Sequence, residues 1–383
     1  MTKERSRPGA WLAIALGVIV MTMLHPARAA VTNRGGPWTF DIRAEAEARY
    51  DDNILGLSGS EKDRVDPTDP NNVSRFRIES PEDLIFSPTL AFGFSRKPRR
   101  GRETDIGASI GANQYLRNTI KNYHEYSVRV LQELNRSRAH RTALTIGGSR
   151  IPSYYLRQLV DDDESAAAGM TVHNSAIYSK NEGYVELSQE IFNRYLSAAG
   201  RYSRVRRDFE FHFNERDSSA NVERVEINVF PLGRIGLRIR PYAEWQSRSA
   251  RGDMASTTVS DDDVGFDSRL LGLDLRGIWG RDADHRNTLR GYWQRESRDF
   301  TTDFIPDTGH FGREDEIRKY GASYDREFGP RWTLGARVYH RVTDVSLPAQ
   351  STSHFTKNVA AVSLGYSFDR RIGTRGEEPR EVP

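Results

Sequence analysis

The sequence predicts an all-β protein, a single up-and-down antiparallel transmembrane β-barrel of about 14 strands. Apolar and polar residues alternate along most of the chain, which is the period of a strand with one apolar face. Many of these segments continue for about 10 residues, the length that a tilted strand needs to cross a bilayer. The links between them alternate between long and short, as in membrane barrels with brief periplasmic turns and longer outer loops.

The first segment, 38–50, sets the pattern. Its Glu-Ala-Glu-Ala-Arg core favours a helix by propensity, but apolar residues occupy every second position from Phe40 to Tyr50. A helix would scatter these residues around its circumference, whereas a strand places them all on one face. We therefore expect Phe40 and Tyr50 at the two membrane interfaces and the intervening charges in the lumen.

The same alternation predicts the other strands. They are expected near 38–50, 84–95, 104–115, 125–134, 141–149, 178–190, 195–205, 219–229, 235–247, 266–279, 287–297, 317–328, 332–341 and 357–368. Long links are expected near 51–83, 116–124, 150–177, 206–218, 248–265, 298–316 and 342–356, with tight turns between them. This order places both ends of the barrel on the side of the tight turns.

The chain opens like a secretory signal peptide. Basic residues precede an apolar run from Trp11 to Leu24, and Ala27-Arg28-Ala29 supplies small residues for cleavage. We expect a signal peptide at 1–29, the barrel at 30–368 and a flexible periplasmic tail at 369–383. The apolar run is too short for a comfortable transmembrane helix of about 20 residues. The predicted location is the outer membrane of a Gram-negative cell.

Charge and composition exclude several classes. The predicted leader carries a net charge of +3, which is the net charge of the whole chain. The mature chain is then about neutral, so a basic pI gives no support for nucleic-acid binding. The chain has 0 cysteines, which excludes a disulfide framework, a thiolate metal site and a lipid-anchored cysteine.

Aromatic residues gather at the ends of the predicted strands. Indole and phenol rings favour the headgroup level, where their apolar and polar parts both find partners. The expected interface aromatics, which would contact membrane lipid and lipopolysaccharide, are Phe40, Tyr50, Trp245, Trp279, Phe328, Trp332, Tyr366 and Phe368. A mean hydropathy of −0.68 is compatible with a membrane barrel, because only alternate residues need to be apolar.

The opposite parity predicts the lumen. The expected lining residues include Arg43, Glu45, Glu47, Arg49, Arg129, Arg238, Arg240, Tyr242, Glu244, Asp274, Arg276, Arg290, Tyr292, Arg337 and Tyr339. Inward-parity charges number 11 of each sign, which argues against a strongly anion-selective pore. Two interpretations remain: a lattice of ion pairs around a narrow or closed interior, or a conduit in which arginines and tyrosines hold carboxylate or sugar groups.

No catalytic, cofactor or metal site is expected. The candidate histidines, His124-Glu125, His310, and His340 with Asp344, each stand near a carboxylate without a surrounding motif. The acidic runs Asp161–Glu164 and Asp261–Asp263, and the Asp-rich stretch 51–69, lack the spaced ligand pattern of a calcium loop. An outer-membrane hydrolase is the least favoured class.

The opening of the predicted barrel resembles a known family. Tyr50-Asp51-Asp52-Asn53-Ile54, followed by a long loop and Ser87-Pro88-Thr89-Leu90, is similar to the start of the beta-barrel porin type 2 family. The barrel of surface lipoprotein assembly modifiers has a similar opening. The resemblance covers about 40–94 and the final strand, where Phe368 fits the terminal aromatic recognised by the barrel-insertion machinery.

The resemblance implies an outer-membrane barrel of the kind that often accompanies exopolysaccharide genes. The expected function is a porin-like channel or export conduit for a polar solute, with polysaccharide as one candidate. The alternative is a structural or assembly barrel with an occluded lumen, whose outer loops bind a partner.

Overall fold

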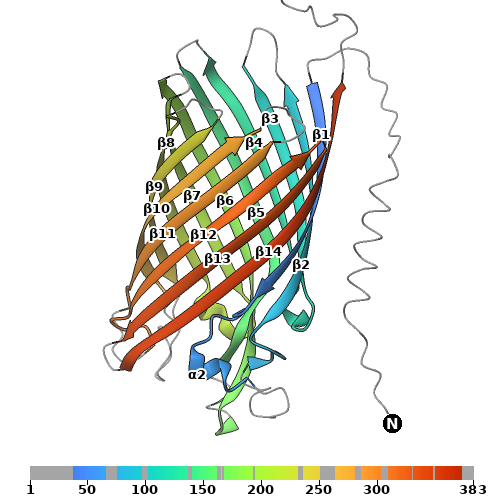
Figure 1. Ribbon diagram of the computed structural model, residues 1–383. Coiled ribbons are helices and arrows are strands. Elements are labelled where there is room, and N and C mark those ends of the chain that lie inside the picture. Colours follow the sequence, from blue (N-terminus) through green and yellow to red (C-terminus); the bar gives the residue numbers. More distant parts are fainter. Residues whose placement is uncertain are drawn as a thin grey trace, which may run out of the picture.

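The chain forms a closed antiparallel barrel of 14 strands, each paired with its neighbours in sequence (Figure 1). The pairing of the first strand with the last closes the wall, which confirms the predicted fold class. The computed structural model describes residues 38–65, 76–96, 102–136, 140–161, 165, 168–192, 195–231, 236–250, 264–280, 286–302, 309–329, 331–347 and 350–372. The predicted signal peptide and most of the predicted tail lie outside these residues.

Each expected strand is present, and several are longer than expected. The strands are β1 (Trp38–Asp51), β2 (Asp83–Arg96), β3 (Thr104–Tyr115), β4 (Tyr123–Arg136), β5 (Arg141–Asp161), β6 (Val172–Phe192), β7 (Leu196–Phe209), β8 (Ser218–Val229), β9 (Leu237–Ala250), β10 (Phe266–Trp279), β11 (Asn287–Phe300), β12 (Glu314–Phe328), β13 (Trp332–Leu347) and β14 (Gln350–Ile372). Short helices α2 (Gly59–Lys62), η1 (Thr119–Lys121) and η2 (Phe211–Arg216) lie in the links. Among the described residues, no helix is long and apolar enough to cross a membrane.

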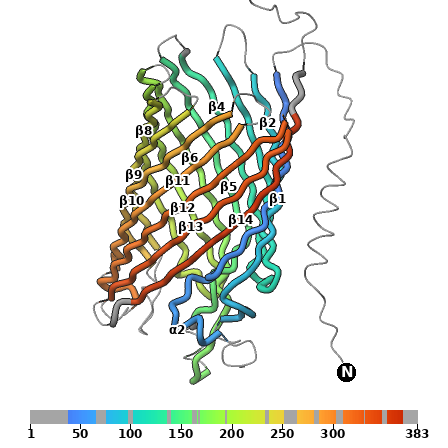
Figure 2. The backbone as a smooth tube through the Cα atoms, viewed as in Figure 1, coloured from blue at the N-terminus to red at the C-terminus, as the bar shows by residue number. Residues whose placement is uncertain are grey.

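The outer surface of the barrel carries a band of apolar side chains. On β10, Leu271, Leu273 and Leu275 point outward and are 59%, 36% and 43% exposed. In a water-soluble protein such a continuous exposed apolar surface is rare, because burying it is the main driving force of folding. All strands cross the wall obliquely (Figure 2), so each apolar face forms part of one band around the barrel.

Two predicted long links are wrong. The link predicted at 150–177 is mostly strand, since β5 and β6 run to Asp161 and from Val172. Residues 151–161 of β5 pair only with β6, so the two strands form a hairpin that projects beyond the barrel (Figure 1, green, bottom). Register shifts between Ile151 and Tyr154 break the period of 2, which hid these strands from a rule based on alternation.

The link predicted at 342–356 is replaced by strand on both sides. β13 and β14 pair as far as Leu347 with Gln350, with a bulge near Val345. At its other end β14 continues past the predicted boundary at 368 to Ile372, which pairs with Trp38. Backbone pairing with the first strand extends the final strand into the charged segment that the sequence assigned to the tail.

The first long link folds into an outer cap, defined as residues 52–65 and 76–82. Its apolar side chains, with those of neighbouring strands, form a buried cluster of Ile54, Leu57, Phe76, Ile78, Ile85, Tyr115 and Tyr155. Ile85 and Tyr115 lie on the inward faces of β2 and β3, which follows from their pairing with Arg49 and with each other. The cap therefore folds inward over the β2–β5 side of the mouth.

Asp52 and Asn53 of the Tyr-Asp-Asp-Asn motif form hydrogen bonds that hold the start of the cap in place. The side chain of Asn53 is fully buried, and its Oδ1 accepts from the Leu57 amide at 2.7 Å. Its Nδ2 donates to the carbonyls of Leu57 and Thr356, both at 2.8 Å. Asp52 accepts from the amide and side chain of Asn358, each at 2.7 Å. The motif thus fastens β1 and the cap to β14.

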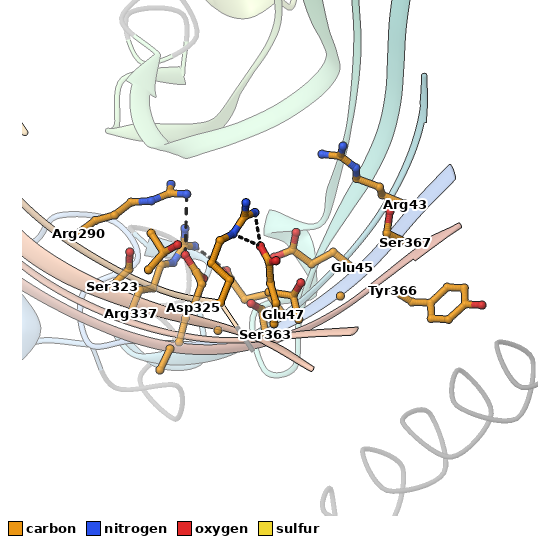
Figure 3. A pocket seen from close by; sticks show the side chains of 18 of the residues that line it. Arg43, Glu45, Glu47, Arg290, Ser323, Asp325, Arg337, Ser363, Tyr366 and Ser367 are labelled. Carbon is orange, nitrogen blue, oxygen red and sulfur yellow. Dashed lines mark hydrogen bonds and ion pairs between the residues drawn. The ribbon is translucent and has the colours of Figure 1, made fainter. Parts of the chain in front are cut away.

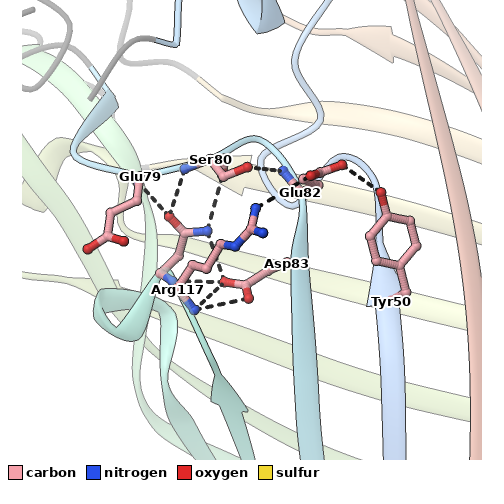
Figure 4. A network of polar contacts seen from close by, with 7 residues as sticks. Tyr50, Glu79, Ser80, Glu82, Asp83 and Arg117 are labelled. Atoms are coloured by element: carbon pink, nitrogen blue, oxygen red, sulfur yellow. Dashed lines mark hydrogen bonds and ion pairs between the residues drawn. The ribbon is translucent and has the colours of Figure 1, made fainter. Parts of the chain in front are cut away.

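A second polar network holds the far end of the cap (Figure 4). The Asp83 carboxylate accepts from the Asn118 amide at 2.8 Å and from the Asn118 side chain at 2.9 Å. Asn118 Oδ1 in turn accepts from the Glu79 amide at 2.7 Å. Tyr50 donates its hydroxyl to Glu82 at 2.6 Å, so this aromatic residue anchors the cap as well as facing outward.

Candidate functional site: the polar lumen

The inner face of the barrel carries the candidate site. Directly paired residues of neighbouring strands point to the same side of the wall, so register assigns each side chain to the lumen or to the exterior. Three hollows open on the lumen, and their lining is dominated by charged side chains. We name them the end hollow, the middle hollow and the side hollow.

The end hollow has a volume of about 460 Å³, and arginines and carboxylates line it in nearly equal numbers. Its charged lining residues are Arg43, Glu45, Glu47, Arg276, Arg286, Arg290, Asp325, Glu327 and Arg337. Arg337 Nη2 lies 2.6 Å from a Glu47 oxygen, and Arg290 lies 3.9 Å from Asp325 (Figure 3). These pairs join β13 to β1 and β11 to β12 across the wall, as a lattice of ion pairs would.

The middle hollow has a volume of about 450 Å³ and an excess of positive charge. Its charged and aromatic lining residues are Arg49, Arg238, Arg240, Asp274, Arg290, Tyr292, Lys319, Arg337 and Tyr339. Asp274 is the one carboxylate among them, and Arg240 forms an ion pair with it. Lys319 Nζ lies 5.5 Å from the ring centre of Tyr292 and 4.5 Å from that of Tyr339. The arrangement presents cations beside aromatic faces.

The side hollow has a volume of about 320 Å³ and lies along β6–β9. Its charged lining residues are Lys180, Glu182, Arg201, Arg207, Arg224, Glu244 and Arg248. Arg201 stacks on Tyr184 at 3.7 Å and Arg224 on Tyr242 at 4.0 Å. Arg201 also forms an ion pair with Glu182 at 2.9 Å.

The structure places the remaining predicted lumen residues as follows. Tyr242 accepts a hydrogen bond from Gln294 at 2.5 Å and lies directly opposite Glu226 and Gly272 in register. Arg129 lies opposite Gly107 on the inner wall, with its side chain 3.9 Å from Asp105. Neither lines one of the three hollows described above.

The sequence missed several lumen residues. Arg207, Arg248 and Arg298 lie just beyond the predicted ends of their strands, near 205, 247 and 297, and so were assigned to loops. Lys180 and Arg224 lie within predicted strands, but those had the least regular alternation. Following the alternate positions one or two residues past each predicted strand end would have found the first three.

A line of inward aromatics follows the outer mouth. Tyr123, Tyr154, Tyr178 and Phe209 lie with successive ring centres 5.2, 5.3 and 5.1 Å apart, on β4, β5, β6 and β7. Further round the wall, Arg248 lies 4.5 Å from the ring centre of Phe266. The mouth therefore combines ring faces with cationic groups, as the middle hollow does.

Lys121 lies where the cap meets this aromatic line. Its Nζ donates to the Tyr155 carbonyl at 3.1 Å and lies 5.0 Å from the ring centre of Tyr154. Burial lowers the pKa of Lys121 to about 7, and the nearby cations Lys357 and Arg157 act in the same direction. This lysine is a titratable group in the wall between the cap and the lumen.

The predicted interface aromatics lie on the exterior of the barrel in two groups, one near each end of the strands. Toward the tight-turn end, Phe40 packs on Phe94 and Trp332 on Tyr366, each with ring centres 4.8 Å apart. Trp279 and Phe328 point outward at the same end and are exposed, and Phe368 pairs with the outward Ile42. Tyr50 and Trp245 are exposed near the other end of their strands. Their contact with lipid headgroups remains a prediction.

The histidines do not assemble with the carboxylates considered from sequence. His340 contacts Asn358 at 2.7 Å, whereas Asp344 contacts His354 at 2.6 Å. His124 and Glu125 are neighbours on one strand, so their side chains point to opposite faces. His310 stacks on Phe300 with ring centres 5.3 Å apart.

The described residues contain no group of three or more metal-ligating side chains. The acidic runs at 162–164 and 261–263 lie outside the described residues.

Comparisons with known proteins bear on the architecture. No family model and no curated protein matches the chain, so the resemblance to the beta-barrel porin type 2 family is not confirmed. Among solved structures, the chain is similar to a bacterial polysaccharide outer membrane secretin, with 10% identity over 87% of this chain and 98% of that one and a TM-score of 0.40. An anion-selective porin from Comamonas acidovorans matches with 8% identity over 86% and 99% of the two chains and a TM-score of 0.38.

The TodX monoaromatic hydrocarbon channel matches with 7% identity over 89% of this chain and 92% of that one, at a TM-score of 0.44. The solutes in these names differ widely, and at such identities and TM-scores the likeness carries no argument about what crosses this barrel. Any statement about the solute has to come from the lumen itself.

Proposed function

We propose that the protein is an outer-membrane channel or export conduit for a polar solute, with polysaccharide as the leading candidate. The observation that carries this proposal is the contrast between the two faces of one closed wall. Hollows lined by arginines, carboxylates and tyrosines open on the inside, and leucine, tryptophan and tyrosine side chains are exposed on the outside. A barrel of this strand number leaves room for water in its interior.

The membrane location is part of the same proposal. A lipid bilayer tolerates no open sheet edge, and the closure of β1 on β14 removes both edges. The outward leucines of β10 would lie in the hydrocarbon, and the aromatics at both ends of the strands would lie at the headgroups. The long-link end, which carries the cap, would face the cell exterior, and the final strand would engage the insertion machinery.

A second candidate is an assembly barrel whose cap closes the lumen and binds a partner. The buried cluster around Leu57 and Phe76 favours it, because an ordered cap over the mouth restricts passage. The protein's projecting β5–β6 hairpin would then offer an additional contact surface.

Conductance in planar bilayers separates the two candidates. Purified full-length protein is compared with a variant in which residues 54–81 are replaced by a short Gly-Ser linker. Stable open-channel steps from the unmodified protein support the conduit. Steps that appear only in the linker variant support the capped assembly barrel, and silence from both, with heat-modifiable folded protein in the membrane, contradicts the conduit. A hydrolase would instead cleave lipid, glycan or peptide and lose this activity on substitution of His124 or His340.

A further inference from the structure

Five arginines of the inner wall stand in one continuous row. Arg238 of β9 pairs directly with Arg276 of β10, and Arg276 pairs with Arg290 of β11. The row continues through Ser323 of β12 to Arg337 of β13, and through Ala361 of β14 to Arg49 of β1. We call Arg238, Arg276, Arg290, Arg337 and Arg49 the arginine row.

The arginine row extends along the inner wall from the tight-turn end of the barrel toward the end that carries the cap. Arg238 lies next to the start of β9 (Leu237–Ala250), at the tight-turn end. Arg49 lies near the end of β1 (Trp38–Asp51), at the end that carries the cap. Because hydrogen-bonded neighbours lie at right angles to strands that are themselves tilted, the row runs obliquely around the lumen. Its members are separated by one or two strand spacings, about 5 or about 10 Å.

The rows of residues on the two sides of the arginine row differ in chemistry. Toward the tight-turn end the next row contains Asp325 and Glu47, which pair with Arg290 at 3.9 Å and with Arg337 at 2.6 Å. On the other side lies a row containing Tyr292 and Tyr339. Beyond it comes a second cationic row, in which Lys319, Arg341 and Lys357 are direct neighbours on β12, β13 and β14. Tyrosine rings are therefore flanked by cations on both sides.

Two members of the row have no ion-pair partner among the described residues. Within the described part of the chain, Arg238 and Arg276 form no ion pair, and their Nε atoms are buried without a hydrogen-bond partner. Like charges directly opposite each other on neighbouring strands destabilise a sheet. The three arginines in direct register therefore repel one another, and two of them lie outside any ion pair of the described chain, so an anionic ligand bound along the row would stabilise this part of the wall.

We propose that the arginine row is the binding track for an acidic polysaccharide, a chain whose sugar units carry carboxylate groups. This inference rests on the proposed function and specifies its solute. Guanidinium groups bind carboxylates by paired, charge-assisted hydrogen bonds, and the tyrosine rings offer flat apolar faces to sugar rings. A small anion needs one site, whereas a row that continues from end to end fits a chain that advances by exchanging neighbouring contacts. The equal numbers of positive and negative charges in the whole lumen do not reveal that the arginines are concentrated in one row.

The proposal is tested on a double variant, Arg238→Gln with Arg276→Gln. Neither arginine has a carboxylate partner among the described residues, so the substitutions leave no orphaned acid. The matched control is Arg204→Gln with Arg269→Gln, two exposed arginines on the outward faces of β7 and β10. Folding of each protein is confirmed by its shift on a gel when heated, and single Arg238→Gln replaces the double variant if that fails to fold.

The probes are hexagalacturonate, which is acidic, and maltohexaose, a neutral sugar of equal length. Binding to detergent-solubilised protein is measured by titration calorimetry, and block of the ion current is measured separately in planar bilayers. The unmodified protein and the control should bind hexagalacturonate at least about tenfold more tightly than maltohexaose. The double variant should bind hexagalacturonate about tenfold more weakly than the unmodified protein, or about threefold for single Arg238→Gln.

Equal affinity of the double variant and the unmodified protein for hexagalacturonate would overturn the arginine row as a binding track. Equal affinity of the unmodified protein for both sugars, or binding of neither, would do the same. Selective binding without any ion current, by contrast, would support the track and count against the open conduit, so the two proposals fail separately.

Discussion

The substitution Asn53→Ala tests how the cap is held over the mouth. The Asn53 side chain is 0% exposed and makes three hydrogen bonds to backbone groups of Leu57 and Thr356. Removing it leaves one amide and two carbonyls without these partners, and each unsatisfied buried group costs about 1–3 kcal/mol. Water will reach some of these groups, so we expect the free energy of cap opening to fall by about 3 kcal/mol. Opening should then be about a hundredfold more frequent.

Amide hydrogen exchange of the intact barrel in detergent measures this opening. Peptides containing Leu57 should lose protection by about a hundredfold, while peptides from β10 and β11 keep theirs. Asn214→Ala, which changes an exposed asparagine in η2, is the matched control and should leave the cap unchanged. Protection of Leu57 within about threefold of the unmodified protein would refute the role assigned to Asn53.

Three further predictions concern charge and membrane exposure. Burial lowers the pKa of Lys121 from 10.5 to about 7, so an open cap binds more protons than a closed cap between these two pH values. The protection of the cap amides from hydrogen exchange should therefore rise with pH from about 7 to 10.5 and stay flat below 7. This rise should be absent in Lys121→Met. Leu273→Arg, on the outward face of β10, should lower the free energy of unfolding from phospholipid vesicles in urea by about 2–4 kcal/mol, whereas Ser363→Arg, on the lumen face of β14 and directly opposite Glu47, should cost about 1 kcal/mol at most. Glu133→Ala removes the buried partner of Arg141 and of a backbone amide at the tight-turn end, and should lower the temperature at which the folded gel band disappears, with a loss of about 3 kcal/mol.

Alternation alone located the wall of the barrel. β3 and β10 begin and end where the sequence placed them, because an unbroken period of 2 and flanking turn residues define both ends. The projecting parts of β5 and β6 were missed because bulges near Tyr154 shift the parity. Outside the membrane no lipid selects apolar side chains, so strand segments there carry no regular signal.

The sequence predicts which residues line the lumen, but it does not predict how these residues are arranged relative to one another. Parity identified Arg49, Arg238, Arg276, Arg290 and Arg337 as inward residues. Their alignment into one row depends on the register of seven strands, which local sequence does not encode because each strand can slide by two residues without changing its faces. The cap was likewise invisible as a folded unit, since its cluster joins residues from distant parts of the chain.

The central claim is that one closed wall has lipid outside and water inside, and alternate labelling along a single strand tests it most directly. The chain has 0 cysteines, so single cysteines can be introduced without background at Leu273, Asp274, Leu275 and Arg276. With the protein in phospholipid vesicles, a charged water-soluble maleimide should label the cysteines at 274 and 276 through the lumen and leave those at 273 and 275 unlabelled in the hydrocarbon. Equal labelling of all four positions, or a pattern without a period of 2, would contradict the account.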